Sequence, residues 1–275
     1  MATVVVVSSP AHATIADKRN DFNRDGISDV VAVNGYDMYF YAGDGNGGIL
    51  PGVYKGTNWH PYSASLATPG DLNRDGIGDL VAIHEDNKCL YRWYGNGSGG
   101  FTGGTQLGCN WGPYEFVLAG AGDLNNDGNG DLLSVNSNNG CLYRWFGNGT
   151  GAFGSAAQLG CNAWSDYRAS LTGVGDLNGD GNADVVSRNA VNECLYRWYG
   201  DGKGNLYGAT QLGCNWGAYI NFSGLGDLNG DGRGDLVAVN YHLDKLYRWL
   251  GNGTGSIGSA AVIGSSFNAA VYLPA

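Results

Sequence analysis

Nine-residue segments with the pattern D-x-N-x-D-G-x-x-D occur five times in the chain, at residues 21–29, 71–79, 123–131, 176–184 and 227–235. Oxygen-bearing side chains at positions 1, 3 and 5 can converge on one cation, and the carboxylate at position 9 can complete its coordination. The glycine at position 6 permits a sharp turn that directs the backbone carbonyl of position 7 toward the same point. All-oxygen ligand sets are typical of hard cations, and a flexible loop suits Ca²⁺ better than Mg²⁺.

The sequence therefore predicts about five structural Ca²⁺ ions, one in each segment. The alternative is a series of Asp- and Asn-rich turns that bind no metal. Three aspartates in nine residues, repeated five times, favour calcium over this alternative. The predicted ligands are Asp21, Asn23, Asp25, Ile27, Asp29, Asp71, Asn73, Asp75, Ile77, Asp79, Asp123, Asn125, Asp127, Asn129, Asp131, Asp176, Asn178, Asp180, Asn182, Asp184, Asp227, Asn229, Asp231, Arg233 and Asp235.

The charge of the chain agrees with metal sites better than with a basic partner. Its formal net charge is −10, and 15 of its 25 acidic residues lie in the five segments. Five Ca²⁺ ions would bring the total to about zero. Basic residues are not clustered, so the sequence does not indicate a nucleic-acid partner. No stretch approaches the ~20 apolar residues that span a membrane.

The first 13 residues have features of a secretion signal. A short apolar run at residues 3–7 is followed by Ala11-His12-Ala13, which has the small-x-small form of a signal-peptidase site. We interpret residues 1–13 as the remnant of a secretion signal; the alternative is an ordinary first strand.

Six cysteines form three pairs with the same spacing of 20 residues. The first and last repeats lack both members of a pair, as expected if the two cysteines of one repeat form a disulfide. Zinc would need four converging ligands, and no C-x-x-C spacing is present. Three disulfides indicate an oxidising compartment and agree with secretion. The predicted pairs are Cys89 with Cys109, Cys141 with Cys161, and Cys194 with Cys214.

The repeat length predicts the fold. Successive segments start 50, 52, 53 and 51 residues apart, a period typical of propeller blades or solenoids. The fourth repeat contains four short strands, at residues 167–174, 183–188, 194–199 and 207–214, which is the content of one blade. We therefore predict an all-β, five-bladed β-propeller over residues 14–275, with blades near 14–60, 61–112, 113–165, 166–217 and 218–275. Residues 268–274 are expected to supply or reinforce the inner strand of the first blade and so close the ring.

At this point the sequence resembles a known family. The pattern D-x-N-x-D-G-x-x-D, followed by an apolar strand and a later G-[ND]-G turn, is similar to the FG-GAP/VCBS repeat of integrin-α-type β-propellers. The resemblance covers the chain from about residue 14 to its end. It implies that the family's metal loop carries over position by position onto the five segments, all of which are intact. Members of the family usually have about seven blades, whereas this chain has five repeats.

A set of aromatic residues after the fourth strand of successive repeats is the candidate ligand surface. Tryptophan and tyrosine beside asparagine and aspartate offer flat apolar faces and planar hydrogen-bonding groups, which suit sugar rings. We expect them on the face of the ring opposite the metal loops. The alternative is that these aromatics pack one blade against the next. The candidate residues are Trp59, Trp111, Tyr114, Trp164, Tyr167, Trp216 and Tyr219.

Catalysis is indicated less clearly than binding. The four histidines occupy unrelated repeat positions, and neither G-x-S-x-G nor H-E-x-x-H occurs. Repeated surfaces favour multivalent binding, in which several weak sites act together. The leading hypothesis is a secreted, calcium-stabilised propeller that binds glycans, as some secreted lectins resembling this family do. The alternatives are a protein-interaction module, by analogy with the integrin head, and a polysaccharide hydrolase or lyase with one pair of acids in the central funnel.

Overall fold

The computed structural model describes residues 19–161, 164–167 and 170–275. The predicted remnant of a secretion signal at residues 1–13 lies outside the described residues, as do residues 14–18 of the predicted first blade. Within the described part, no helix is long and apolar enough to cross a membrane.

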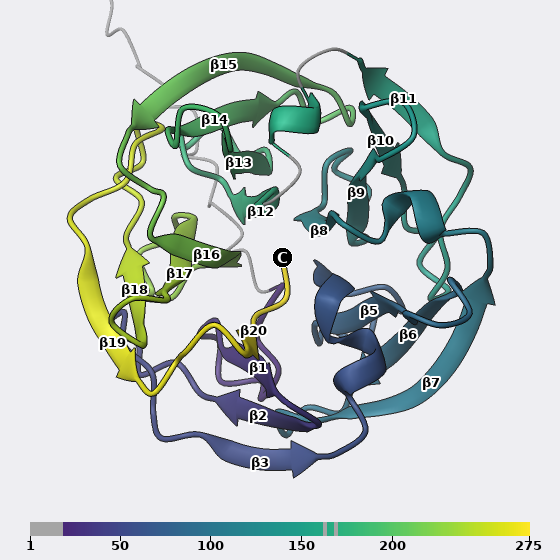
Figure 1. The fold of residues 1–275 in the computed structure, drawn as a ribbon, viewed down its shortest axis with the longest axis horizontal. Coiled ribbons are helices and arrows are strands. Elements are labelled where there is room, and N and C mark those ends of the chain that lie inside the picture. The colour runs from purple at the N-terminus through teal and green to yellow at the C-terminus, as the bar shows by residue number, and fades with distance from the viewer. Residues whose placement is uncertain (1–18, 162–163, 168–169) are drawn as a thin grey trace, which may run out of the picture.

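Five four-stranded antiparallel sheets surround a central axis, which confirms the predicted five-bladed β-propeller (Figure 1). Blade one contains β20 (Val271–Tyr272), β1 (Val30–Asn34), β2 (Asp37–Tyr41) and β3 (Val53–Gly56). Blade two contains β4 (Leu66–Gly70), β5 (Asp79–Ile83), β6 (Leu90–Gly95) and β7 (Phe101–Gly108). Blade three contains β8 (Leu118–Gly122), β9 (Asp131–Asn136), β10 (Cys141–Trp145) and β11 (Ala157–Gly160). Blade four contains β12 (Thr172–Gly175), β13 (Asp184–Arg188), β14 (Leu195–Gly200) and β15 (Leu206–Gly213). Blade five contains β16 (Tyr219–Gly226), β17 (Asp235–Asn240), β18 (Lys245–Trp249) and β19 (Ala261–Ser265).

Three short 3₁₀ helices lie between blades in the described part of the chain. They are η1 (His60–Ser65), η2 (Gly112–Tyr114) and η3 (Trp164–Asp166). Each follows the outer strand of one blade and leads to the inner strand of the next.

Because the strands of a blade are antiparallel and consecutive, the ring has two different rims. The loop rim carries the D-x-N-x-D-G-x-x-D segments and the hairpin tips that join the third and fourth strands. The segments join the first and second strands in blades two to five, and in blade one the segment leads into β1, the second strand of that blade. The aromatic rim carries the turns between the second and third strands and the connections from one blade to the next.

The C-terminal segment closes the ring, as the sequence predicts. Tyr272 pairs with Val33 and Val271 pairs with Asn34, so β20 is the inner strand of blade one. The chain then reaches the centre of the ring (Figure 1). There the Ala275 carbonyl accepts a hydrogen bond from the Gly120 N–H at 2.8 Å, and the Ala275 N–H donates to the Leu66 carbonyl at 3.0 Å. The contact between blades five and one, where the chain passes from β19 of blade five to β20 of blade one, is called the seam below.

The hydrophobic core is divided among the blade interfaces. At the seam, for example, Val30 of β1, Leu225 of β16 and Leu246 of β18 pack together with Phe267 and Val271, and all five side chains are buried. Similar clusters join blades one and two, two and three, three and four, and four and five. Strands that bury both faces against neighbouring sheets explain the apolar runs that follow each metal loop.

The three predicted disulfides are present. Each joins the start of the third strand to the end of the fourth, at the open end of the hairpin on the aromatic rim. The pairs are Cys89–Cys109, Cys141–Cys161 and Cys194–Cys214, and no cysteine of the described residues is free.

Candidate functional site

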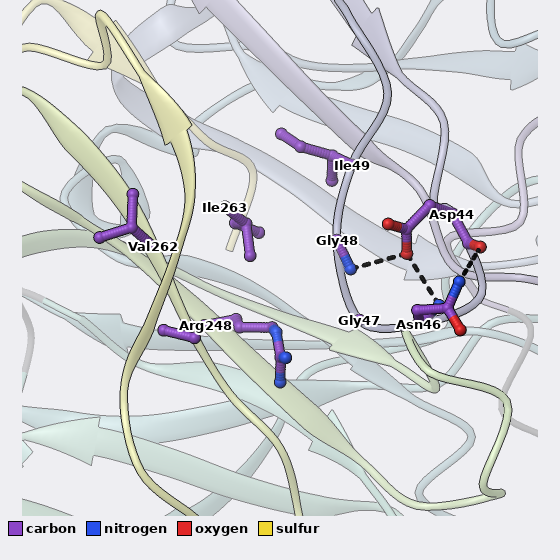
Figure 2. A pocket seen from close by; sticks show the side chains of 9 residues that line it. Asp44, Asn46, Gly47, Gly48, Ile49, Arg248, Val262 and Ile263 are labelled. Atoms are coloured by element: carbon purple, nitrogen blue, oxygen red, sulfur yellow. Dashed lines mark hydrogen bonds between the residues drawn. The ribbon is translucent and has the colours of Figure 1, made fainter.

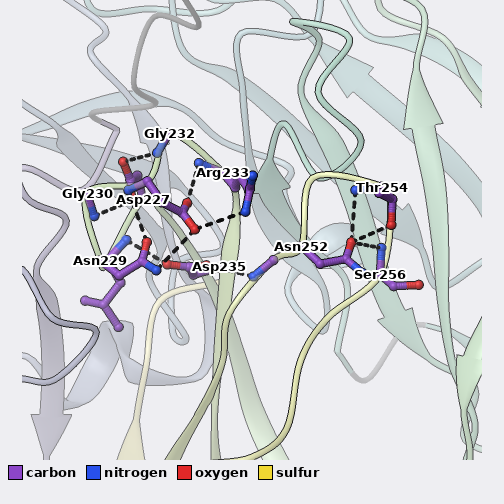
Figure 3. A network of polar contacts seen from close by, with 12 residues as sticks. Asp227, Asn229, Gly230, Gly232, Arg233, Asp235, Asn252, Thr254 and Ser256 are labelled. Atoms are coloured by element: carbon purple, nitrogen blue, oxygen red, sulfur yellow. Dashed lines mark hydrogen bonds and ion pairs between the residues drawn. The ribbon is translucent and has the colours of Figure 1, made fainter.

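The five loops share one backbone arrangement, which Figure 3 shows for the fifth. The Asp227 carboxylate accepts the Gly230 and Asp231 amides on Oδ1 and the Gly232 amide on Oδ2. Gly232 has φ +80°, a conformation that disfavours other residues. The position-1 to position-6 bond recurs in all five loops at 2.7–2.9 Å. The loops are thus sharp turns built around their first aspartate.

Positions 3 and 5 of each loop also lie together. The Asn229 side-chain amide donates to Asp231 Oδ2 at 3.2 Å, and the equivalent contact is present in the other four loops. The side chains that are predicted to bind calcium at positions 1, 3 and 5 are therefore gathered on one turn.

The aspartate at position 9 has a role that the sequence analysis missed. In blade two, Asp79 is fully buried; its Oδ2 accepts the Leu72 amide at 2.8 Å and its Oδ1 accepts the Gly95 amide at 2.9 Å. Leu72 belongs to the same loop, whereas Gly95 begins the neighbouring hairpin tip. The carboxylate therefore holds the loop to the hairpin. The equivalent aspartates Asp29, Asp131, Asp184 and Asp235 make the same two bonds in their blades.

The first glycine of each hairpin tip follows from this contact. A Cβ on Gly95 would lie 2.4 Å from the Gly78 carbonyl oxygen, and a Cβ at the equivalent glycine of the other blades would lie 2.2–2.3 Å from a backbone carbonyl oxygen. A side chain would push the amide away from the aspartate. We call this aspartate contact between the loop and the hairpin tip the clip. Its signal in the sequence is the glycine that follows position 9 by 14 residues in blade one and by 16 in the other four.

Burial changes the acidity of the position-9 carboxyls. It raises the pKa of Asp29, Asp79, Asp131, Asp184 and Asp235 to about 7. The two donated amides oppose this shift, whereas the aspartates at positions 1 and 5 of the same loop add to it. None of the five has an ion-pair partner among the residues that the structure describes.

The donor set fits a hard cation, because each loop gathers three carboxylates and an amide oxygen. In the fifth loop Arg233 also lies 3.5 Å from Asp231 and offsets part of that negative charge. The arrangement itself does not display a ready-made site. Across the described residues, no group of three or more His, Cys, Asp or Glu side chains could hold a metal ion. Calcium therefore stays a prediction, with positions 1, 3, 5 and 9 as the side chains that would hold it.

The candidate aromatic residues lie on the predicted rim, where they join neighbouring blades. Trp111, after β7, packs on Trp145 of β10 with ring centroids 4.9 Å apart, and Tyr114 meets the same indole edge-on at 5.0 Å. Equivalent contacts join Trp59 to Trp93, Trp164 to Trp198 and Trp216 to Trp249, and join Tyr167 and Tyr219 to the same partner indoles. At the seam, Phe267 and Tyr41 replace the tryptophan pair.

These aromatics therefore stabilise the blade interfaces, the alternative that the sequence left open. Trp216 retains only 8% of its surface. Trp59, Trp111, Trp164 and the three tyrosines are partly exposed, so part of each ring remains on the surface.

Beside three of these clusters lies a polar group that the sequence analysis did not identify. Asn87 donates to the Tyr91 hydroxyl at 3.0 Å, and this hydroxyl is 3.0 Å from Gln106 Oε1. We call such a set a triad. Two further triads are Asn139–Tyr143–Gln158 and Asn192–Tyr196–Gln211.

Each triad adjoins the aromatic cluster of its own blade interface. Tyr91 packs on Tyr62, Tyr143 on Tyr114 and Tyr196 on Tyr167, with centroids 5.5–5.8 Å apart. The asparagine and glutamine of every triad are exposed. Blade five has Leu243 and Val262 at the equivalent positions, and blade one has Gly35 and Tyr54. The signal in the sequence is N-x-C-L-Y followed by Q-L-G-C, which only the three disulfide-bonded blades contain.

The arginine of the L-Y-R-W strand links blades near the loop rim. Arg92 stacks over Tyr94, 4.1 Å from its centroid, and donates to the Thr150 carbonyl in the next hairpin tip at 3.1 Å. Arg144 and Arg197 do the same with Phe146 and Tyr199, donating to the Gly204 and Gly255 carbonyls. In blade one, which has Phe40 at this position, Lys55 of β3 takes over: its Nζ lies over the Phe40 ring and donates to Ser98 at 2.6 Å.

Comparison with known proteins agrees with this architecture. An FG-GAP-like repeat model matches residues 21–82, 71–134, 123–187, 176–237 and 227–273. No curated protein sequence matches the chain.

Two lectins are among the similar solved structures. One is an Agrocybe aegerita lectin described by its specific recognition of non-reducing terminal N-acetylglucosamine, with a TM-score of 0.50 and 19% identity. The match covers 90% of this chain and 65% of the lectin, so this chain spans just under two thirds of its length. The other is the BP39L lectin of Burkholderia pseudomallei, with a TM-score of 0.51 and 13% identity over 87% of this chain and 70% of that one. At these identities the likeness concerns the fold. The repeat match, which spans nearly the whole described ring, shows that the chain belongs to the FG-GAP-like repeat family.

Proposed function

We propose that this protein is a secreted, calcium-stabilised propeller that binds carbohydrate at several sites on its aromatic rim. The observation that carries the proposal is the threefold repetition of an exposed Asn–Tyr–Gln triad beside a partly exposed aromatic cluster. The lectin names of the two similar structures support the ligand class. The three disulfides support an oxidising, extracellular compartment.

The chemistry of a triad suits a sugar. Its tyrosine hydroxyl is already held by two partners, which fixes the neighbouring amides in place. The Gln106 Nε2 group donates to no residue that the structure describes, so its two N–H groups are available to ligand hydroxyls. The adjacent Tyr62 and Tyr91 rings offer an apolar surface for the CH face of a pyranose. One such site is small, and affinity would come from three acting together.

Calcium, when bound, would supply charge neutralisation in the loops and no reaction step. The loops lie on the rim opposite the triads, so the metal would support the ring without touching the ligand.

A glycan array with the calcium-loaded protein tests the proposal, and glycans ending in N-acetylglucosamine are the first to examine. Selective binding to one sugar class is expected. The triple variant Gln106→Ala, Gln158→Ala, Gln211→Ala should lose at least ten-fold in binding while its melting temperature stays unchanged, because all three side chains are exposed. The tryptophans are unsuitable targets, because removing them would weaken the blade interfaces.

Blade five offers a matched gain-of-function variant. Leu243→Asn with Val262→Gln would place a fourth triad around Tyr247, and binding should strengthen. A blank array with folded protein would remove carbohydrate binding as the leading function and direct attention to protein partners.

A further inference from the structure

The guanidinium of Arg248 is the exception among the four arginines of the L-Y-R-W strands. Arg92, Arg144 and Arg197 each stack on an aromatic ring two residues further along and donate to a carbonyl of the next blade. Blade five has Leu250 where the ring would be. Arg248 forms no hydrogen bond or ion pair with any residue in the described part of the chain. Its Nε is buried without a partner, as are those of the other three arginines, so the difference lies in the terminal nitrogens of its guanidinium.

A pocket of about 350 Å³ opens at this position (Figure 2). It lies at the seam, between β19 and the hairpin tip of blade one. Arg248 extends from one side toward Gly47, and the tip residues Asp44 and Asn46 face it from the other. Ile49 and Ile263 contribute apolar surface.

The polar groups of the pocket are complementary. Asp44 Oδ1 accepts the Asn46 and Gly48 amides, both at 2.8 Å, whereas its Oδ2 accepts no bond from a described residue. These two amides hold the pKa of Asp44 below its ordinary value, and Arg248 adds a smaller effect in the same direction. The carboxylate and the guanidinium lie further apart than an ion pair, and together they carry no net charge. A neutral ligand that both donates and accepts hydrogen bonds fits this arrangement, whereas an anion would be repelled by the Asp44 carboxylate.

We propose that this pocket binds one neutral saccharide unit, whose hydroxyls donate to Asp44 and accept from Arg248 while a CH face rests on Ile49 and Ile263. The ligand class extends the proposed function, but the site is separate. It lies near the loop rim at the seam, whereas the triads lie on the aromatic rim of blades two to four.

The test is a titration of ¹⁵N-labelled protein with a panel of neutral methyl glycosides and with methyl glucuronoside, followed by amide chemical shifts. At least one neutral glycoside should shift the amides of residues 44–49 and 261–263. If no neutral glycoside moves them, or if only the glucuronoside does, the assignment is wrong.

Two variants separate binding from folding. Leu250→Tyr supplies the ring that Tyr94, Phe146 and Tyr199 provide in the other blades. The Arg248 guanidinium should stack on this ring, so the affinity for the neutral glycoside should fall at least ten-fold without a lower melting temperature. Asp44→Asn keeps the turn, since Asn96, Asn148 and Asn252 stand at the equivalent positions, and it should also weaken binding. Unchanged titrations in both variants would overturn the proposal.

The triad variant distinguishes this site from the proposed function. The protein with Gln106→Ala, Gln158→Ala and Gln211→Ala should bind the neutral glycoside at the seam as the parent does, even though its array signal is lost. Loss of the seam shifts in this variant would show that the pocket is not an independent site.

Discussion

The loop rim and the aromatic rim of the ring differ in how strictly they repeat. On the loop rim, all five blades have the same buried aspartate holding the same two amides. On the aromatic rim, only blades two to four have a disulfide and a triad, and blade one borrows its inner strand from the C-terminal segment. Because all five blades keep this aspartate, we infer that the blade requires it for stability; a buried amide without an acceptor would lower the free energy of unfolding. Blades one and five fold without triads, so the triads are not needed for folding and are available for binding.

The largest effect should follow from opening the seam. Removal of residues 268–275 deletes β20 together with Val271 and Leu273, which are buried. Each of these side chains contributes about 1.5–3 kcal/mol, and β1 also loses its partner strand. We expect the ring to unfold at a much lower denaturant concentration or not to fold at all. Phe267→Leu, which changes the packing at the seam but keeps β20, is the control for the deletion. An unchanged unfolding midpoint after the deletion would show that the seam contributes nothing to closure.

A pair of variants in one loop tests the strictness of the loop rim. Asp131→Ala leaves the Leu124 and Gly147 amides buried without an acceptor, which should cost about 2–5 kcal/mol even without calcium. Asp127→Asn, at an exposed position of the same loop, should change calcium-free stability by less than about 0.5 kcal/mol and reduce only the stabilisation by added Ca²⁺. Urea unfolding with and without EDTA measures both. Equal losses of calcium-free stability in the two variants would contradict the role of Asp131 in holding the loop to the hairpin tip.

The pH dependence of the calcium-free protein should follow the same aspartates. Their pKa is about 7 in the folded protein, above the ordinary value of 3.8. The folded state therefore keeps protons that the unfolded chain releases. The associated stability is fully present below about pH 4 and is lost as the pH rises through 7. In EDTA the melting temperature should fall by several degrees between pH 5 and pH 8, and Ca²⁺ should largely remove the fall. A flat profile in EDTA would be inconsistent with the burial of these carboxyls.

The smallest change in stability is expected from replacing single arginines of the L-Y-R-W strands, and two of them can be compared. Arg144→Ala removes the contact with the Phe146 ring and the bond to the Gly204 carbonyl, and we expect a loss of about 1–3 kcal/mol. Arg248→Ala should cost less than about 0.5 kcal/mol, because its guanidinium has neither partner. Thermal unfolding of both variants in the same buffer measures the difference. Similar losses would show that Arg248 has a structural role like its counterparts.

The sequence predicted what depends on spacing along the chain. The period near 50 indicated blades, the paired absence of cysteines indicated the disulfides, and the alignment of residues 268–274 with an inner strand indicated the closure. It did not reveal contacts between blades or between distant parts of one blade. Asp79 could be read as a metal ligand, but its bond to Gly95 requires knowing that the loop and the hairpin tip share a rim. Lys55 could not be recognised as the substitute for an arginine, because it comes from a different strand.

The inner strand of blade one has a consequence for self-association. β20 meets β1 through only two residue pairs and is joined to it by no covalent link near the contact. A β20 from a second molecule presents the same sequence and satisfies the same edge equally well. Intramolecular closure therefore competes with strand exchange, and the balance depends on protein concentration. Concentrated protein refolded from denaturant would accordingly contain linked rings, whereas dilute protein would give single ones.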